Sequence, residues 1–107
     1  MELWDVYDIN VQKTGKIKVR GDKLEKHEFH LVVAVCVFNS DGKMLIQQRH
    51  PEKRGWPGMW DITAAGSAIH KETSRQAVAR ELKEEVGIEI DFSNKRPLLT
   101  VNFERGF

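Results

Sequence analysis

GSAIHKETSRQAVARELKEEVGI, residues 66–88, is the stretch of sequence that decides the fold. Thr73 followed three residues later by Gln76 forms a capping-box pattern, which is typical of a helix N-terminus. Apolar residues then recur at every fourth position, at Val78, Leu82 and Val86. Gly87 is suited to end the helix in a left-handed conformation. We therefore predict a helix between Thr73 and Gly87 that packs its apolar face on a sheet.

Upstream of this stretch, the sequence predicts two hairpins. Residues 4–8 and 16–20 read as short strands joined through a turn at Thr14-Gly15. Residues 31–38 form a continuous, β-branched apolar run, which indicates a strand buried on both faces. The turn residues 39–42 lead from this run to a second strand at 44–49.

The segments on either side of the helix complete the expected sheet. Residues 50–58 contain two prolines and two glycines and predict a loop, and residues 59–65 return as a short strand. After the helix, residues 88–92 and 97–103 read as two more strands separated by a polar turn. We therefore expect short strands both before and after the helix.

Composition limits the function classes. Hydrophobic residues make up 40% of the chain and charged residues 31%, with a net charge of +1, which is typical of a globular protein and not of a general nucleic-acid binder. Cys36 is the only cysteine, so no internal disulfide forms, and a reducing cytoplasm fits. In its apolar strand we expect Cys36 to be buried. The longest apolar run is too short to span a membrane, and the N-terminus does not resemble a signal peptide.

Three glutamates share one face of the predicted helix. Glu81, Glu84 and Glu85 stand at positions i, i+3 and i+4, where like charges repel. Spacing alone is compatible with a solvated acidic face. The alternative is a divalent cation that neutralises the three carboxylates, because Mg²⁺ prefers oxygen ligands and commonly binds together with a substrate phosphate.

The wider pattern resembles the Nudix box. It runs from Gly66 through Glu72, Arg80-Glu81-Leu82 and Glu84-Glu85 to Gly87-Ile88, and it matches the box in every defining position. The resemblance implies an α+β fold, namely a Nudix-type α/β/α sandwich with a mixed β-sheet. It implies a Mg²⁺- or Mn²⁺-dependent hydrolase that cleaves a diphosphate linkage in a small molecule, with no nucleic-acid polymer and no membrane as partner.

The resemblance also implies roles for single residues. Glu81 and Glu85 are the principal metal ligands, Glu84 is a further ligand or a water-mediated partner, and the carbonyl of Gly66 completes the set. The same three glutamates are the catalytic candidates, with one of them as general base. Glu72 and Arg80 correspond to a structural pair that ties the loop to the helix, and Gly87 has a structural role. In many members glycines occupy the positions of Ala65 and Lys71.

Features upstream of the box resemble a particular branch of the family. His30, the triplet 47–49 and the stretch 56–61, WPGMWD, are similar to isopentenyl-diphosphate isomerase and its hydrolase-like relatives. The isomerase reaction needs a cysteine on the strand before the box, where residues 63–66 read TAAG. Isomerase activity is therefore disfavoured.

Basic and aromatic residues before the box are candidates for substrate binding. Arg49 is the best candidate, with Lys53 and Arg54, because guanidinium and ammonium groups bind diphosphate oxygens. A solvated basic loop is the equal alternative. For Trp56 and Trp60, stacking on a substrate competes with internal packing, and packing is the favoured interpretation for Trp60.

Residues 1–107 are expected to form a single Nudix domain that lacks the usual C-terminal helix and ends early. The apolar side of 98–103, with Leu99, Val101 and Phe103, would then be exposed, which favours a homo-oligomer. Two further functions stay open: a non-catalytic module that binds a diphosphate, and a purely structural fragment.

Overall fold

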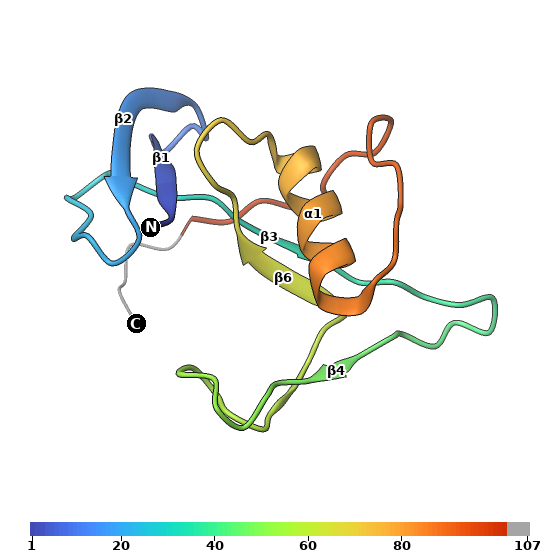
Figure 1. Ribbon diagram of the computed structural model, residues 1–107. Helices are drawn as coiled ribbons and strands as arrows, with labels where there is room; N and C mark the ends of the chain where they lie inside the picture. Colours follow the sequence, from blue (N-terminus) through green and yellow to red (C-terminus); the bar gives the residue numbers. More distant parts are fainter. Residues whose placement is uncertain (103–107) are drawn as a thin grey trace.

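The structure is a computed structural model that describes residues 1–102. It contains one helix and six short strands (Figure 1). In chain order these are β1 (Leu3–Tyr7), β2 (Lys13–Val19), β3 (Val32–Val35), β4 (Gln47–Gln48), β5 (Trp60–Asp61), β6 (Ala64–Ser67) and α1 (Ser74–Val86). The strands pair as β1 with β2, β3 with β6, and β4 with β5.

The N-terminal hairpin forms as predicted, but its turn lies elsewhere. β1 and β2 are antiparallel, with Leu3 opposite Val19 and Tyr7 opposite Lys13. Asp8 makes the turn, because its Oδ1 accepts hydrogen bonds from the backbone N–H groups of Asn10 (2.8 Å) and Gln12 (3.0 Å). The turn predicted at Thr14-Gly15 is therefore wrong, and both residues lie inside β2.

The core lies where β3 and β6 meet α1. β3 and β6 are antiparallel, with Val33 opposite Gly66 and Val35 opposite Ala64. Small buried residues let the helix approach closely, and Val33, Ala68 and Ala77 form the centre of the cluster. Only one face of the strand pair is covered by α1. Val32, on the other face, is 57% exposed, so the prediction of a strand buried on both faces is wrong.

The predicted hairpin leads into an arm (residues 47–61), which contains β4, the loop at 50–58 and β5 and extends away from α1 (Figure 1). Asn39 forms the expected turn, since its backbone N–H donates to Lys43 (2.9 Å) and its carbonyl accepts from Gly42 (3.0 Å). β3 pairs with β6, and β4 pairs with β5 after the predicted loop at 50–58, so the strands predicted at 31–38 and 44–49 meet only next to the turn, at Phe38 and Met44. The segment predicted as one strand at 59–65 contributes to two, because β5 and β6 pair with different partners.

Thr63 fixes the base of the arm. Its side chain is fully buried between β5 and β6. The hydroxyl accepts a hydrogen bond from the backbone N–H of Val37 (2.9 Å) and donates to the carbonyl of Leu45. A threonine at this point satisfies two backbone groups that the bend between the strands leaves unpaired.

Both predicted ends of α1 are confirmed. Thr73 Oγ1 accepts from the backbone N–H of Gln76 (3.1 Å), and the Gln76 side chain accepts from the N–H of Thr73 (3.0 Å), which completes the capping box. Gly87 has φ 74° and donates its N–H to Lys83. Leu82 is fully buried against the sheet, as the apolar period predicted.

The two strands predicted after the helix are wrong. Residues 88–102 contain neither strand nor helix, and Phe103 lies outside the described residues. A strand is stabilised by its hydrogen-bonded neighbour, and no described segment pairs with this one. Leu98 and Leu99 are exposed, with Leu99 73% accessible, so the expected uncovered apolar residues are present without a strand.

The fold is α+β, as predicted. All strand pairs between residues 1 and 102 are antiparallel, whereas a mixed sheet would also contain parallel pairs. The described part of the chain has α1 on one side of β3 and β6, in place of helices on both sides of a sandwich. No helix within residues 1–102 is long and apolar enough to cross a membrane.

Candidate functional site

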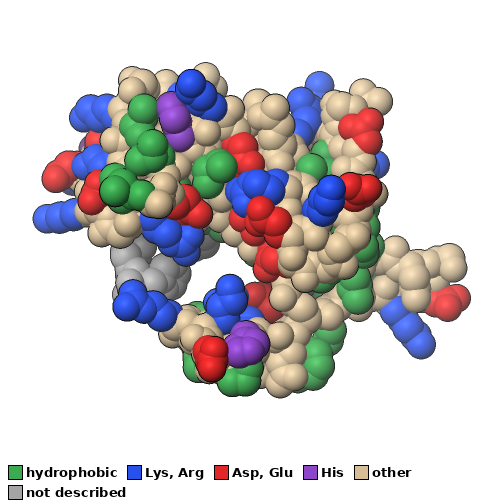
Figure 2. Space-filling model, in the orientation of Figure 1, with side chains coloured by type: hydrophobic (Ala, Val, Ile, Leu, Met, Phe, Trp, Pro, Cys, Tyr) green, Lys and Arg blue, Asp and Glu red, His purple; other side chains and the backbone are tan. Residues whose placement is uncertain are grey.

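The site lies where α1 meets β6, because Glu81 lies over Gly66 and Glu85 accepts a hydrogen bond from Ala65. Glu81, Glu84 and Glu85 all belong to α1, and their surroundings differ. The Glu81 side chain is 15% exposed and that of Glu84 is 59% exposed. In the space-filling view, acidic and basic side chains lie next to one another above a hollow that separates the arm from the rest of the molecule (Figure 2).

Glu81 lies directly over Gly66 of β6. A Cβ atom added at Gly66 would overlap the Glu81 carboxylate, so this position accepts no side chain without a shift of the helix or of Glu81. Burial raises the pKa of Glu81, and the nearby Glu85 and Glu84 raise it further, although Arg80 acts in the opposite direction. Burial therefore disfavours the charged form of this carboxylate, although it forms an ion pair with Arg80.

Glu85 is held by groups from two strands. One carboxylate oxygen accepts a hydrogen bond from the Gln47 side chain (3.0 Å), and the other accepts from the backbone N–H of Ala65 (3.0 Å). The same Gln47 amide donates to the carbonyl of Thr63 (3.0 Å). Gln47 thus joins the arm to α1, a role that sequence reasoning did not assign to it.

Arg80 and Glu72 meet as the sequence led us to expect. The guanidinium contacts the Glu72 carboxylate through two nitrogens, at 2.6 and 3.0 Å, and also donates to the carbonyl of Ser67 (3.1 Å). The Arg80 guanidinium lowers the pKa of Glu72, and that carboxylate in turn raises the pKa of Arg80. The contact ties the loop before α1 to the helix.

Arg80 also reaches the acidic face. Its Nη1 lies 2.8 Å from Glu81 and 3.2 Å from Glu84. Each of the three carboxylates therefore accepts at least one hydrogen bond from the protein. As arranged in the described residues, no group of three or more His, Cys, Asp or Glu side chains is placed to hold a metal ion. A cation at this face would compete with Arg80 and Gln47 for the carboxylate oxygens.

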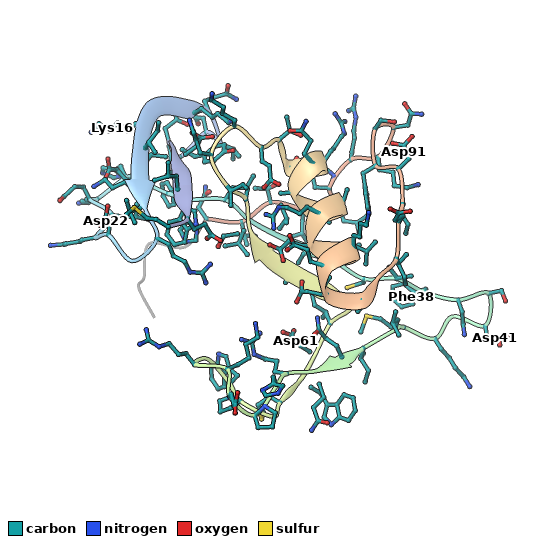
Figure 3. The ribbon with its side chains drawn as sticks, in the orientation of Figure 1. Lys16, Asp22, Phe38, Asp41, Asp61 and Asp91 are labelled. Atoms are coloured by element: carbon teal, nitrogen blue, oxygen red, sulfur yellow. The ribbon has the colours of Figure 1, made fainter. Side chains whose placement is uncertain are left out.

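The three basic candidates lie on the arm. Arg49 Nε donates to the carbonyl of Gly55 (2.8 Å), and its Nη1 lies 3.6 Å from Asp61. Figure 3 shows Asp61 on the side of the arm toward α1. Lys53 and Arg54 are exposed in the loop, and neither side chain has a hydrogen bond or ion pair to any residue between 1 and 102. Lys53 and Arg54 therefore differ from Arg49, whose guanidinium contacts both Gly55 and Asp61.

Two expectations about side-chain packing are wrong. Trp60 was expected to pack inside the protein, but it is 65% exposed, because only two residues of β5 pair and the outer face of the arm is uncovered. Trp56 is also exposed. Cys36 was expected to be buried, but it is exposed, because it follows the end of β3 and no described segment covers it.

Comparison with known proteins identifies the family. The model of the NUDIX domain matches residues 28–105. The chain belongs to the Nudix family. The stretch 66–88 is therefore a Nudix box in a Nudix domain, and Glu72, Arg80 and the three helix glutamates occupy its defining positions.

Individual relatives point the same way. An uncharacterized Nudix hydrolase of Listeria innocua is 53% identical over the whole of this chain, which spans 63% of the relative's length. An isopentenyl-diphosphate Delta-isomerase of Saccharopolyspora erythraea is 41% identical over 57% of this chain and 31% of its own length. The crystal structure of DR0079 from Deinococcus radiodurans has a TM-score of 0.73 and 31% identity, and the match covers 84% of this chain and 55% of that one.

The N-terminal hairpin supports the loop of the Nudix box. Asp5 of β1 accepts hydrogen bonds from His70 Nδ1 (2.7 Å) and the backbone N–H of Lys71 (2.8 Å), and it forms an ion pair with Lys13 (3.1 Å). Burial disfavours ionisation of Asp5, but these three partners outweigh it and lower its pKa to about 2. Sequence reasoning missed Asp5, although a lone carboxylate inside the apolar strand LWDVY signals a specific partner.

Lys71 shows why the family so often has glycine at its position. Its φ is 72°, the left-handed region that side chains other than glycine rarely adopt. The hydrogen bond to Asp5 helps to hold Lys71 in this conformation. The loop therefore keeps its left-handed turn although this chain has Lys71 where many members of the family have glycine.

Proposed function

We propose that this chain is a hydrolase that cleaves a diphosphate linkage in a small organic molecule, with Mg²⁺ or Mn²⁺ as cofactor. The observation that carries the proposal is the position of Glu81, close over Gly66 and next to Glu84 and Glu85. Membership of the Nudix family supports the reaction class. The chain spans 63% of the Listeria innocua relative, and the activity of the whole protein is part of the proposal.

The residues at the acidic face fit a hard divalent cation. We assign Glu81 and Glu85 as principal ligands, with Glu84 and the carbonyl of Gly66 as further ligands. Carboxylate and carbonyl oxygens are the donors that Mg²⁺ prefers. Burial and the neighbouring Glu85 and Glu84 raise the pKa of Glu81, and a bound cation would favour its charged form. When bound, the cation supplies neutralisation of the diphosphate charge and polarisation of its phosphorus–oxygen bonds.

The remaining roles belong to the chain's own side chains. One of the three glutamates accepts a proton from the attacking water while the water oxygen bonds to phosphorus. The leaving phosphate takes the electron pair of the P–O bond that breaks. Arg49, assisted by Lys53 and Arg54, binds phosphate oxygens. Glu72, Arg80 and Gly87 keep the loop and the helix in position.

Phosphate release tests the proposal. Nucleoside diphosphate derivatives, other organic diphosphates and isopentenyl diphosphate would be incubated with the chain, with and without Mg²⁺. We expect metal-dependent release that falls at least about a hundredfold in Glu81→Gln and Glu85→Gln. Glu89→Gln is the matched control, because Glu89 pairs with Lys83 on the surface. Equal activity in all three variants would contradict the assignment.

A diphosphate-binding module without turnover is the alternative. It is favoured by the hydrogen bonds that already occupy all three carboxylates, through Arg80, Gln47 and the backbone of Ala65. Calorimetry distinguishes the two functions, since the module would bind a diphosphate and release no phosphate. Isomerisation of isopentenyl diphosphate is not expected, because residues 63–66 provide no thiol.

A further inference from the structure

Gln47 lies between the arm and the acidic face of α1. Its side-chain amide is half-buried and donates to the Glu85 carboxylate (3.0 Å) and to the carbonyl of Thr63 (3.0 Å). The helix packs mainly on β3 and β6, whereas β4 and β5 contact mainly each other. A polar side chain that bridges these two parts of the fold therefore keeps the arm next to the last turn of α1.

Glu85 is a side chain that needs such a contact to be ordered. It is exposed and lies one residue before the end of α1. An exposed glutamate occupies several rotamers, and fixing it in one of them costs conformational entropy. Gln47 and the backbone N–H of Ala65 bond to different oxygens of the carboxylate, so they set both its position and its rotation. The side chain is therefore ordered on folding, before any ligand binds.

The two hydrogen bonds leave room for a ligand on Glu85. An ionised carboxylate has about four lone-pair sites, and the bonds from Gln47 and Ala65 occupy two of them. Gln47 is neutral, so it can share these oxygens with a cation without the charge repulsion that Arg80 would cause at Glu81 and Glu84. Carboxylates that bind metals are commonly oriented by hydrogen-bond donors of this kind.

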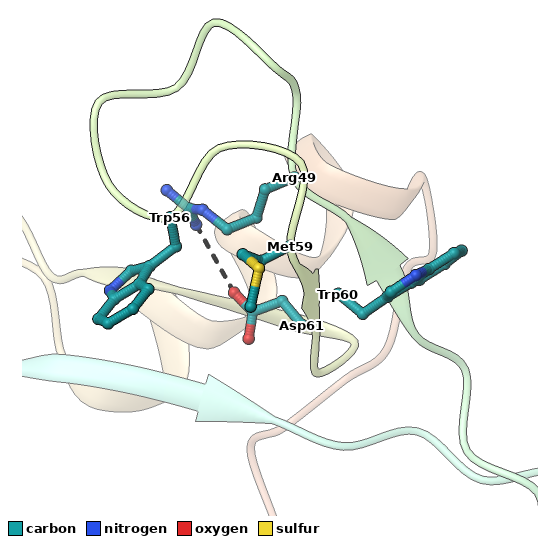
Figure 4. A pocket seen from close by; sticks show the side chains of 5 residues that line it. All are labelled: Arg49, Trp56, Met59, Trp60 and Asp61. Atoms are coloured by element: carbon teal, nitrogen blue, oxygen red, sulfur yellow. Dashed lines mark ion pairs between the residues drawn. The ribbon is translucent and has the colours of Figure 1, made fainter.

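Strand register places Gln47 on the same face of the arm as Arg49. Gln47 pairs with Asp61, and opposed residues of an antiparallel pair project to the same face. Arg49 follows two residues later, and its Nη1 lies 3.6 Å from Asp61 (Figure 4). Gln48 projects to the other face, where its amide donates to the carbonyl of Gly58 (2.9 Å). The two neighbouring glutamines therefore make comparable hydrogen bonds, but only Gln47 contacts Glu85.

We propose that Gln47 is a positioning residue, which orients the Glu85 carboxylate for the divalent cation and keeps the Arg49 face of the arm beside it. The inference rests on the proposed function, in which Glu85 is a principal ligand. Gln47 acts through Glu85 and is itself neither a metal ligand nor a catalytic residue. Removing its amide should therefore lower the affinity for the cation, and this loss should disappear when Glu85 is absent.

Calorimetry with Mn²⁺ tests this role in Gln47→Met, which keeps the length of the side chain and removes its N–H donors. We expect the Mn²⁺ affinity to fall at least about tenfold, because removing a group that orients a metal ligand typically weakens binding about 10- to 100-fold. Gln48→Met is the matched control and should bind Mn²⁺ as the unaltered chain does. In a Glu85→Ala background, Gln47→Met should change the affinity by less than about twofold, because its acceptor is gone.

Urea unfolding of the same variants without metal tests the contact itself. The effects of Gln47→Met and Glu85→Ala should be non-additive, with a coupling of at least about threefold in the unfolding equilibrium constant. Those of Gln48→Met and Glu85→Ala should add.

The inference is overturned if Gln47→Met binds Mn²⁺ at least as tightly as the unaltered chain, or if it weakens binding equally with and without Glu85. If the unaltered chain binds no Mn²⁺ but Gln47 and Glu85 are coupled in unfolding, the proposed metal site is contradicted and the ordering of Glu85 by Gln47 is supported. Absence of both Mn²⁺ binding and coupling would contradict both proposals.

Discussion

Replacing Asp5 by asparagine tests whether the N-terminal hairpin supports the Nudix box. Asparagine has the same shape, and its oxygen still accepts the hydrogen bond from Lys71, but it lacks the negative charge that interacts with Lys13 and His70. The Asp5 side chain is 11% exposed, so solvent screens these interactions only weakly. We expect the substitution to destabilise the fold at neutral pH.

The magnitude follows from the pKa of Asp5. The folded protein lowers this pKa from 3.8 to about 2. A tenfold change in an equilibrium constant corresponds to about 1.4 kcal/mol, so the charged form contributes about 2 kcal/mol to the free energy of unfolding at pH 7. Because the pKa is depressed, the contribution is complete above the unfolded value near 3.8 and is lost as the pH falls through about 2. At pH 3 about half of it should remain.

Urea unfolding of the chain and of Asp5→Asn, at pH 7 and pH 3, measures both quantities. The difference in unfolding free energy should be about 2 kcal/mol at pH 7 and about 1 kcal/mol at pH 3. Asp41→Asn, at an exposed turn, is the control and should change stability by less than about 0.5 kcal/mol. A difference that is equal at the two pH values would show that the charge of Asp5 is not what stabilises the hairpin contact.

Three further predictions concern the loop, the strand and the exposed residues. Lys71→Gly should raise the free energy of unfolding by about 0.5–1 kcal/mol in urea titrations, because glycine adopts the left-handed conformation without strain. Gly66→Ala should lower it by more than about 1 kcal/mol and weaken Mn²⁺ binding in calorimetry, because the new Cβ displaces the Glu81 carboxylate. Light scattering should show a homo-oligomer that Leu99→Ser with Val101→Ser makes monomeric, since both side chains are exposed.

Among the features that local sequence determines, the ends of α1 and the turn at Asn39 were predicted, whereas the turn at Asp8 was not. The ends of α1 depend on Thr73, Gln76 and Gly87, which lie within or next to the helix, and all three behave as their positions indicate. Cap chemistry and apolar period act over a few residues, so they are visible in the sequence. The same holds for the turn at Asn39, whose side chain bonds to its own neighbours.

The parts that depend on distant partners were not predicted. Residues 88–92 have the composition of a strand, but strand formation needs a neighbour, and composition does not specify one. Trp60 and Cys36 were expected to be buried for the same reason: apolar character indicates a tendency, whereas burial requires another segment to cover the residue. Gln47 contacts Glu85, which is 38 positions away in the sequence, and Asp5 contacts His70, which is 65 positions away. No short-range pattern reveals such contacts.

Packing and the candidate site depend on the same small residues of β6. Ala64 is buried in the described fold, and Gly66, two residues later on the same face, leaves room for the carboxylate of Glu81. A larger residue at either position would push α1 outward, and this movement would carry Glu81, Glu84 and Glu85 with it, because all three are fixed to one helix. Substitutions that enlarge β6 should therefore reduce stability and metal binding together, whereas Glu81→Gln, which keeps the volume of the side chain, should reduce metal binding alone.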